Sequence, residues 1–352
     1  MLTLRNVEYL NGSRVLITGG TGSLGQQLTR LILAHSTDSV VVIYSRDEFK
    51  QFQIEQALAP ALRPRVRFFL GDVRDGDRLQ RAMEGVDYVI HAAALKQVPA
   101  AEYNPFEFVK TNVMGAENVI NAAIANDVRH VVALSTDKAA NPINLYGATK
   151  LCSDKLFVSG NSYSGRHPTR FSVVRYGNVV GSRGSVIPFF LARRHEAELP
   201  ITDERMTRFW ITLEQGAALV LNALRDMKGG EIWVPRIPSM RVTDLARVIA
   251  PRARHRPVGI RPGEKLHEVM VPVDDGRQTL AFARHFIIKP TFPWWEASWH
   301  ADKGGQPCPD GFYYGSDNNQ EWVGEAELAA MISGLDLPEA QAWARERAAG
   351  AG

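Results

Sequence analysis

The sequence predicts an α/β protein built on a doubly wound parallel sheet, with a smaller C-terminal α/β lobe. Short apolar, β-branched segments alternate with longer segments of helical periodicity through the first half of the chain. These short segments are apolar without alternation, as expected of parallel strands covered on both faces. The first of them continues through a glycine-rich turn into a helix. The 352 residues, 45% of them hydrophobic, suffice for a large domain and a second lobe.

Six strands and five helices are expected in the first half, each strand bounded by Gly, Asp or Ser. The strands are expected at 14–17, 40–44, 66–70, 88–91, 131–134 and 171–174, and the helices at 24–33, 49–58, 79–83, 106–125 and 146–157. After Gly177 the chain is richer in turns, and helices are expected at 213–227 and 242–249.

Composition excludes several classes of function. The net charge is only +3, because basic and acidic residues are nearly equal in number, and the basic residues form no tail. No nucleic-acid partner is therefore expected. Cys152 and Cys308 have no metal-ligand spacing, so neither a metal site nor a disulfide framework is expected. No segment has the roughly 18 consecutive apolar residues that a membrane helix needs, and the first residues do not resemble a signal peptide. We therefore expect a cytoplasmic protein with no membrane contact.

The glycine-rich turn is the first candidate binding site. Glycines at these spacings permit a tight turn, close approach of the backbone to a pyrophosphate and close packing of helix on strand. The alternative is an incidental turn, but a strand precedes it and a helix follows it. We expect a dinucleotide to lie against Thr18, Gly19, Thr21, Gly22, Ser23, Leu24 and Gly25.

The ends of the next strands suggest which dinucleotide binds. Ser45, Arg46 and Lys50 suit a ribose 2′-phosphate, which favours NADP over NAD. The alternative is that Asp47 holds an unphosphorylated ribose and that the two cations form a solvated face. Asp72, at the end of the third strand, is expected to meet the adenine. A ribose is expected to lie against Ala92, Ala93 and Ala94, at the end of the fourth strand.

Tyr146 and Lys150 lie four residues apart at the start of an expected helix, so both side chains lie on one face. A phenol beside an ammonium group loses its proton more easily, which makes Tyr146 a candidate base for an alcohol proton. The alternative is a pair on the helix surface.

These motifs resemble the extended short-chain dehydrogenases/reductases that act on nucleotide sugars. Longer segments resemble one family among them, the inverting UDP-N-acetylglucosamine 4,6-dehydratases of pseudaminic acid biosynthesis. The match extends from about Ser13 to about Met331, through HAAALKQVP at 91–99, STDKA at 135–139, NLYGATK at 144–150, RYGNVVGSRG at 175–184 and RPGEK at 261–265.

The resemblance implies a reaction that oxidises C4, eliminates water across C5 and C6, and reduces C6 with inversion at C5. Tyr146 and Lys150 are expected to serve the oxidation, and Asp137 and Lys138 the elimination, beside Thr136. A lysine that acts as a base must be neutral, so a lowered pKa is expected for Lys138. The alternative for Asp137 and Lys138 is a surface ion pair. NADP is expected to stay tightly bound and to be recycled.

The resemblance also implies further binding residues and a division into domains. Additional cofactor contacts are expected from Val73, Lys96, Asn112 and Val179, and UDP-sugar contacts from Lys96, Asn178, Arg183, Thr202, Arg208, Arg261 and Glu264. The NADP-binding Rossmann domain is expected at 11–178, with 208–230 packing back on it. The UDP-sugar lobe and C-terminal extension are expected at 179–207 and 231–332, with a tail at 333–352. Residues 338–352 are expected to form a helix that frays into this tail.

Several alternatives remain at this stage. A retaining dehydratase or a UDP-sugar epimerase fits the same scaffold, although an epimerase needs no base at C5. A regulator that senses NADPH without catalysis would be expected to lack Tyr146, Lys150 or Lys138, and all three are present. The resemblance implies flagellin glycosylation as the destination of the product and a homo-oligomer, a hexamer or a dimer.

Overall fold

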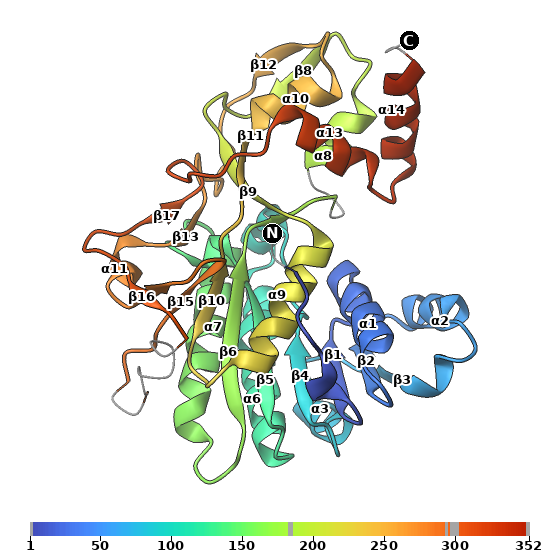
Figure 1. Ribbon diagram of the computed structural model, residues 1–352, viewed down its shortest axis with the longest axis vertical. Coiled ribbons are helices and arrows are strands. Elements are labelled where there is room, and N and C mark those ends of the chain that lie inside the picture. Colours follow the sequence, from blue (N-terminus) through green and yellow to red (C-terminus); the bar gives the residue numbers. More distant parts are fainter. Residues whose placement is uncertain (1–2, 182–185, 293–294, 296–302, 350–352) are drawn as a thin grey trace. The chain divides into compact units, whose positions relative to one another are not determined.

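The computed structural model describes residues 3–181, 186–292, 295 and 303–349, which form two compact units (Figure 1). Unit 1 comprises Met1–Tyr176, Leu213–Arg236 and Met270–Tyr313. Unit 2 comprises Gly177–Thr212, Ile237–Val269 and Tyr314–Gly352. Within the described residues, no helix is both long enough and apolar enough to cross a membrane.

Unit 1 is built on a ten-stranded sheet in the order β16-β14-β15-β10-β6-β5-β4-β1-β2-β3. The seven strands from β10 to β3 are parallel, and β15, β14 and β16 continue the sheet antiparallel. This confirms the doubly wound parallel sheet. The strands are β1 (Arg14–Thr18), β2 (Val40–Ser45), β3 (Val66–Leu70), β4 (Tyr88–His91), β5 (His130–Thr136), β6 (Arg170–Tyr176), β10 (Ile232–Pro235), β14 (Thr279–Ala281), β15 (His285–Ile288) and β16 (Gln306–Pro307).

Helices cover both faces of this sheet because its strands are apolar on both sides. α1 packs beside α9 in one layer, and α3, α6 and α7 pack together in another. The helices of unit 1 are α1 (Ser23–His35), α2 (Glu48–Ala57), α3 (Gly76–Ala82), α4 (Val98–Tyr103), α5 (Pro105–Phe108), α6 (Gly115–Ala125), α7 (Leu145–Tyr163), α9 (Leu213–Asp226) and α11 (Val273–Gly276), with single 3-10 turns at Glu8–Leu10, Arg63–Arg65 and Asp137–Ala139.

The helix expected at 106–125 is divided. Val109–Met114 form a π-helix between α5 and α6. Such wide turns are uncommon and often occur at functional sites. Asn112 lies in this turn with 1% of its surface exposed, and its hydrogen bonds are described below.

Unit 2 has its own core, in which Phe190, Leu245 and Trp343 are buried together. It contains a three-stranded sheet in the order β11-β9-β7 and a parallel pair of β8 and β12. Its elements are β7 (Asn178–Val179), α8 (Val186–Ala192), β8 (Glu198–Ile201), β9 (Thr207–Ile211), β11 (Ser239–Arg241), α10 (Val242–Ile249), β12 (Arg254–Pro257), β17 (Tyr314–Gly315), α13 (Glu325–Ser333) and α14 (Pro338–Ala349); β13 (Val269–Val271) spans the boundary.

The division into units differs from the expected one in several places. Residues 208–212, expected to pack on the first domain, belong to unit 2, and residues 231–236, expected in the lobe, belong to unit 1. Residues 270–313, expected in the lobe, belong to unit 1 because β14, β15 and β16 extend its sheet. Residues 338–349, expected as a helix that frays into a tail, form α14, which buries Trp343 in the core of unit 2. The indole Nε1 of Trp343 donates a hydrogen bond to the carbonyl oxygen of Ile249 at 3.0 Å.

We expect Trp343→Ala to destabilise unit 2 by about 3 kcal/mol, because it removes a buried indole and leaves a cavity. Urea unfolding followed by circular dichroism measures the change. Arg345→Ala is the matched control, since Arg345 is exposed on the same helix. Equal midpoints for the two variants would contradict the docking of α14.

Candidate active site

The glycine-rich turn joins β1 to α1 at the point where the strand order reverses between β1 and β4. Gly19 has φ +66°, and a Cβ there would lie 2.9 Å from the Cα of Ala93. A Cβ at Gly25 would lie 2.6 Å from the backbone of Gly20. Side chains at these positions would fill the turn, so its glycines leave open the backbone surface that a pyrophosphate needs.

A buried hydrogen-bond network holds β1 and β4 together behind this turn. The amides of Ala92 and Ala93 donate to the Thr18 hydroxyl oxygen at 3.1 and 3.2 Å. Thr18 Oγ1 lies 2.8 Å from Nδ1 of His91. Since Thr18 already accepts two bonds, we assign its proton to this contact, which makes Nδ1 the acceptor of a neutral imidazole. Burial, and next the charge of Lys150, lower the pKa of His91 to about 3.

The three residues expected to hold a 2′-phosphate have different surroundings. Ser45 is buried, and its hydroxyl accepts a hydrogen bond from Gln51 at 3.0 Å. Lys50 pairs with Asp47, which also caps α2. The side chain of Arg46 is 54% exposed and contacts Asp72 at 3.5 Å. Arg46 is therefore the cation at this strand end that is best placed to reach a ligand.

The candidate catalytic residues come together at the end of β5. Thr136 ends the strand, and its hydroxyl donates to Asp137 Oδ1 at 2.9 Å. Lys138 Nζ donates to the same oxygen at 3.0 Å. Asp137 is buried, whereas the side chain of Lys138 is 24% exposed. The expected pair is thus a partly buried ion pair at a strand end, and not one on the open surface.

Tyr146 reaches this pair because α7 begins close to it. Asn144 caps α7 by accepting a hydrogen bond from the Gly147 amide at 2.7 Å. A Cβ at Gly147 would overlap the carbonyl oxygen of Lys138, so glycine is needed for this approach. Tyr146 itself hydrogen-bonds with the side chain of Thr136. Residues 136–138 and 146 therefore form one cluster.

Burial dominates the acidity of Tyr146 and raises its pKa to about 12, while Lys138 and the Thr136 hydrogen bond favour the phenolate. The cation that acts on this phenol is therefore Lys138, whereas Lys150 was expected. Burial also lowers the pKa of Lys150.

A buried acid that the sequence analysis missed compensates Lys150. Asp154 lies one helical turn after Lys150 and favours its charged form. Asp154 accepts hydrogen bonds from Ser135 at 2.7 Å and Arg175 at 3.3 Å. Burial raises the pKa of Asp154, while Arg175, Lys150 and Ser135 oppose this rise. The spacing of Lys150 and Asp154 on one helix face was a usable signal, but the ends of β5 and β6 that complete the cluster were not visible in the sequence.

Asn112 joins the π-helix to the loop after β4 and to α7. Its amide exchanges two hydrogen bonds with the backbone of Leu95, both 2.9 Å long, and donates a third to Thr149 at 3.1 Å. The Thr149 hydroxyl in turn donates to the carbonyl of Tyr146 at 2.8 Å. In the described structure Asn112 thus positions the backbone of two candidate binding segments.

Those residues expected to bind the sugar nucleotide that the structure describes lie in unit 2, except Lys96, which is exposed in unit 1. Arg208 is bound within its own unit, since it donates to the carbonyls of Thr207 and Leu266 at 2.7 and 3.1 Å. Asn178 and Glu264 each have a buried side-chain oxygen with no hydrogen-bond partner among the described residues. Thr202 follows β8, Arg261 is exposed in a turn, Val179 is in β7, and Arg183 lies outside the described residues.

The remaining predicted cofactor residues lie at the ends of parallel strands in unit 1. Asp72 and Val73 follow β3, and Asp72 is held by Arg74 at 2.8 Å. Thr21 lies in the glycine-rich turn, and Ser23 and Leu24 begin α1. Ala94 is exposed after β4. Among the described residues, no group of three or more His, Cys, Asp or Glu side chains is placed to hold a metal ion.

The buried neutral His91 makes the stability of the fold depend on pH. Between pH 6.5 and 4.5 the unfolded chain takes up a proton at this residue and the folded chain does not. The free energy of unfolding should therefore fall as the pH falls, by about 1.4 kcal/mol per pH unit from this residue. Urea unfolding at a series of pH values should show this slope reduced by one proton in His91→Asn. The control is His35→Asn, since His35 is exposed at the end of α1. The same slope in both variants would refute the assignment.

Comparisons with known proteins identify the family of the chain. Residues 15–290 match the model of the polysaccharide biosynthesis protein family. Two inverting UDP-N-acetylglucosamine 4,6-dehydratases from strains of Campylobacter jejuni are 52% and 53% identical, over 92% of this chain and 98% of each relative. A UDP-glucose 4-epimerase from Rickettsia canadensis is 43% identical over 74% of this chain and 78% of the relative.

Solved structures agree with the fold. Pen from Bacillus thuringiensis superposes with a TM-score of 0.81 at 36% identity, covering 92% of this chain and 97% of that one. DesIV, a dTDP-glucose 4,6-dehydratase from Streptomyces venezuelae, has the same fold, with a TM-score of 0.63 at 24% identity over 72% of this chain and 86% of that one. The chain belongs to the polysaccharide biosynthesis protein family and, within it, to the inverting UDP-N-acetylglucosamine 4,6-dehydratases.

Proposed function

We propose that this protein converts UDP-N-acetylglucosamine to UDP-2-acetamido-2,6-dideoxy-β-L-arabino-hex-4-ulose, with a nicotinamide dinucleotide that is recycled. The observation that carries this proposal is the hydrogen-bonded pair of Asp137 and Lys138 in the same cluster as Tyr146. Oxidation at an alcohol needs one base, and elimination of water needs a second base and an acid. The cluster supplies three groups of these types at one strand end. The names of relatives that are 52% and 53% identical support the same reaction.

The glycine-rich turn fits the dinucleotide because a Cβ at Gly19 or Gly25 would fill it. The chemistry that a bound nicotinamide would supply is a hydride acceptor for oxidation at C4 and a hydride donor for reduction at C6. Residues 18–25 would hold its pyrophosphate, and Asp72, Val73 and Ala92–Ala94 its adenosine side. Arg46 would bind a 2′-phosphate, which makes NADP the form that we propose.

Tyr146 would remove the proton of the C4 hydroxyl. With its pKa raised to about 12 by burial, the phenol depends on nearby positive charge to act as a base at neutral pH. Lys138 and the Thr136 hydroxyl already favour its phenolate. We assign Lys150 to the same step, as a buried cation that Asp154 helps to keep charged.

Proton transfer within the Asp137–Lys138 pair would create both groups that elimination needs. If the Lys138 proton moves across the 3.0 Å hydrogen bond to Asp137, a neutral amine and a carboxylic acid result. The amine then takes the C5 proton, which the C4 ketone has made acidic. The acid gives its proton to the C6 hydroxyl, which leaves as water. The pair ends the elimination as it began, as ammonium and carboxylate. Reduction at C6 then requires a proton at C5, and this uptake is balanced when Tyr146 releases to solvent the proton that it took from the C4 hydroxyl.

Unit 2 would bind the sugar nucleotide. The buried oxygens of Asn178 and Glu264 that lack partners among the described residues support this assignment, because ligand hydroxyl groups would satisfy them. We propose Thr202, Arg261, Arg183 and Lys96 as further contacts. Since Arg208 already donates to two backbone carbonyls, we propose that it shapes this site.

We also propose that the reaction opens pseudaminic acid biosynthesis for flagellin glycosylation, in the cytoplasm, in a homo-oligomer. A UDP-sugar epimerase is the second candidate, favoured by the Rickettsia canadensis relative that is 43% identical. The two candidates differ in product, since an epimerase changes only the configuration of an existing carbon and a dehydratase makes a methyl group.

Proton NMR of the protein with UDP-N-acetylglucosamine in heavy water tests the proposal. We expect a new C6 methyl signal, a 4-keto sugar, and deuterium at an inverted C5. Lys138→Ala should abolish the methyl signal while the cofactor stays bound, because the eliminating base is lost. Lys155→Ala is the control, since Lys155 is exposed on α7. Retained configuration at C5 or a C4 epimer without a methyl group would overturn the proposal, and normal dehydration by Lys138→Ala would overturn the assigned base.

Cofactor preference gives a separate test. Arg46→Ala should weaken NADP binding about tenfold and leave NAD binding unchanged, because the guanidinium pairs only with the 2′-phosphate. Isothermal titration with each dinucleotide measures both affinities. Arg30→Ala is the control, since Arg30 is exposed on α1. Tighter binding of NAD than NADP by the unmodified protein would show that the preference is wrong.

A further inference from the structure

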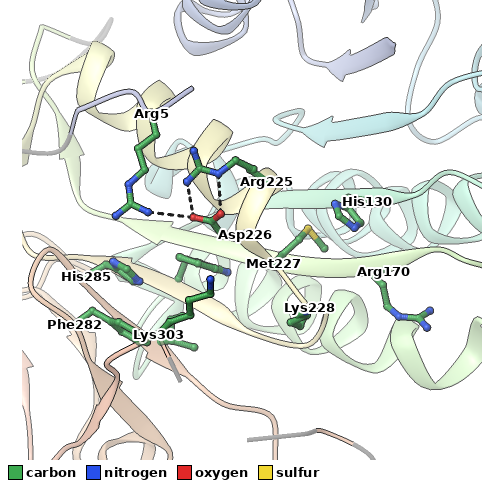
Figure 2. A pocket seen from close by; sticks show the side chains of 12 residues that line it. Arg5, His130, Arg170, Arg225, Asp226, Met227, Lys228, Phe282, His285 and Lys303 are labelled. Carbon is green, nitrogen blue, oxygen red and sulfur yellow. Dashed lines mark hydrogen bonds and ion pairs between the residues drawn. The ribbon is translucent and has the colours of Figure 1, made fainter. Parts of the chain in front are cut away.

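A cavity of about 510 Å³ lies in unit 1, away from the candidate active site (Figure 2). His130 and Arg170, the first residues of β5 and β6, contribute to its lining. Thr136 is at the opposite end of β5, roughly 20 Å away at about 3.3 Å per residue. In a parallel sheet the reactive groups follow the strand ends, so this cavity at the strand starts has no part in the reaction proposed above.

The lining of this cavity is strongly basic. Its basic side chains are Arg5, Arg170, Arg225, Lys228 and Lys303, and the acid in its described lining is Asp226. Arg225 donates to Asp226 at 2.7 and 2.6 Å, and Arg5 contacts the same carboxylate at 3.4 Å. Figure 2 shows both guanidinium groups meeting this carboxylate. The acid is thus neutralised, and the lining keeps a formal excess of four positive charges that favours an anion.

The same cavity has an aromatic and apolar wall. The imidazole of His285 stacks on Phe282 at 4.6 Å between ring centroids and on Trp233 at 4.9 Å. Met227 and Ile287 are buried beside them in the lining. A small inorganic anion would leave this wall without a partner, whereas a ligand that carries a flat ring would bury it.

We propose that this cavity binds a nucleoside phosphate at a site distinct from the proposed cofactor and substrate sites. The cavity volume is within the range of about 300–1,000 Å³ for ligand pockets. Lys228, Lys303 and Arg170 would hold the phosphate through their positive charge. Arg5 and Arg225 are already engaged by Asp226. The base would pack against the wall that contains Phe282 and Met227. The four excess positive charges indicate the phosphate of the ligand, and the stacked rings indicate its base.

Isothermal titration with AMP, GMP, CMP and UMP tests this proposal on the full-length protein. No competing nucleotide is added, and the charge-reversal variants described next separate binding at the cavity from binding at the proposed cofactor and substrate sites. At least one monophosphate should bind with a Kd below about 1 mM, and the matching nucleoside at least about tenfold more weakly. Binding should weaken as salt is raised.

Charge reversal locates the site. Lys228→Glu combined with Lys303→Glu should weaken the binding by at least about tenfold. The control is Arg30→Glu combined with Arg63→Glu, which changes the net charge equally at exposed positions outside the cavity lining. Circular dichroism melting identifies any variant that fails to fold, and the alanine pair at 228 and 303 then replaces the glutamates.

Three results would overturn the proposal. They are the absence of binding by all four monophosphates, equal losses in the cavity variant and its control, and inorganic phosphate binding as tightly as the best nucleotide. The last result would show a general anion site without recognition of a ring.

Discussion

A lysine side chain removed from water needs an opposite charge close by, because the cost of burying an isolated ammonium group exceeds the stability margin of most domains. Lys150 is 3% exposed, and Asp154 supplies that charge from the next turn of α7. Asp154 is itself bound to Ser135 and Arg175, which belong to β5 and β6. One compensated group of charges therefore attaches the helix to two strands of the sheet.

The position of α7 determines the geometry of the reactive cluster. With the helix held against β5, Gly147 lies against the Lys138 carbonyl, and Tyr146 contacts Thr136. The same region contains opposing influences on acidity. Burial makes Tyr146 a weaker acid, while Lys138 has the opposite effect. Because the ion pair of Lys138 with Asp137 is only partly buried, a ligand that covers it would strengthen each of these electrostatic effects.

The sequence predicts most of unit 1 because its strands are unbroken apolar segments with turn residues at both ends. All six strands expected in the first half are present, with ends within two residues of the expected bounds. The short strands β14, β15 and β16 carry no comparable pattern, and only their pairing shows that they extend the main sheet. The same limit applies to the site. Local spacing identified Tyr146 and Lys150 as candidates, and the resemblance implied Asp137 and Lys138. Neither could reveal contacts made across strands. Those contacts include the hydrogen bond between Thr18 and His91, the bond from buried Arg175 to Asp154, and the hydrogen bonds that Arg208 donates to backbone carbonyls.

The chain passes from one unit to the other five times, after residues 176, 212, 236, 269 and 313. Neither unit is therefore a continuous segment of sequence, and no single cut or truncation can release one of them whole. Unit 1 is completed only when residues 279–307 have been synthesised, since they supply the strands at one edge of its sheet. Until then β10 lacks its antiparallel neighbour β15 and offers unpaired backbone groups. During synthesis, this edge can therefore pair with other chains until β15 covers it.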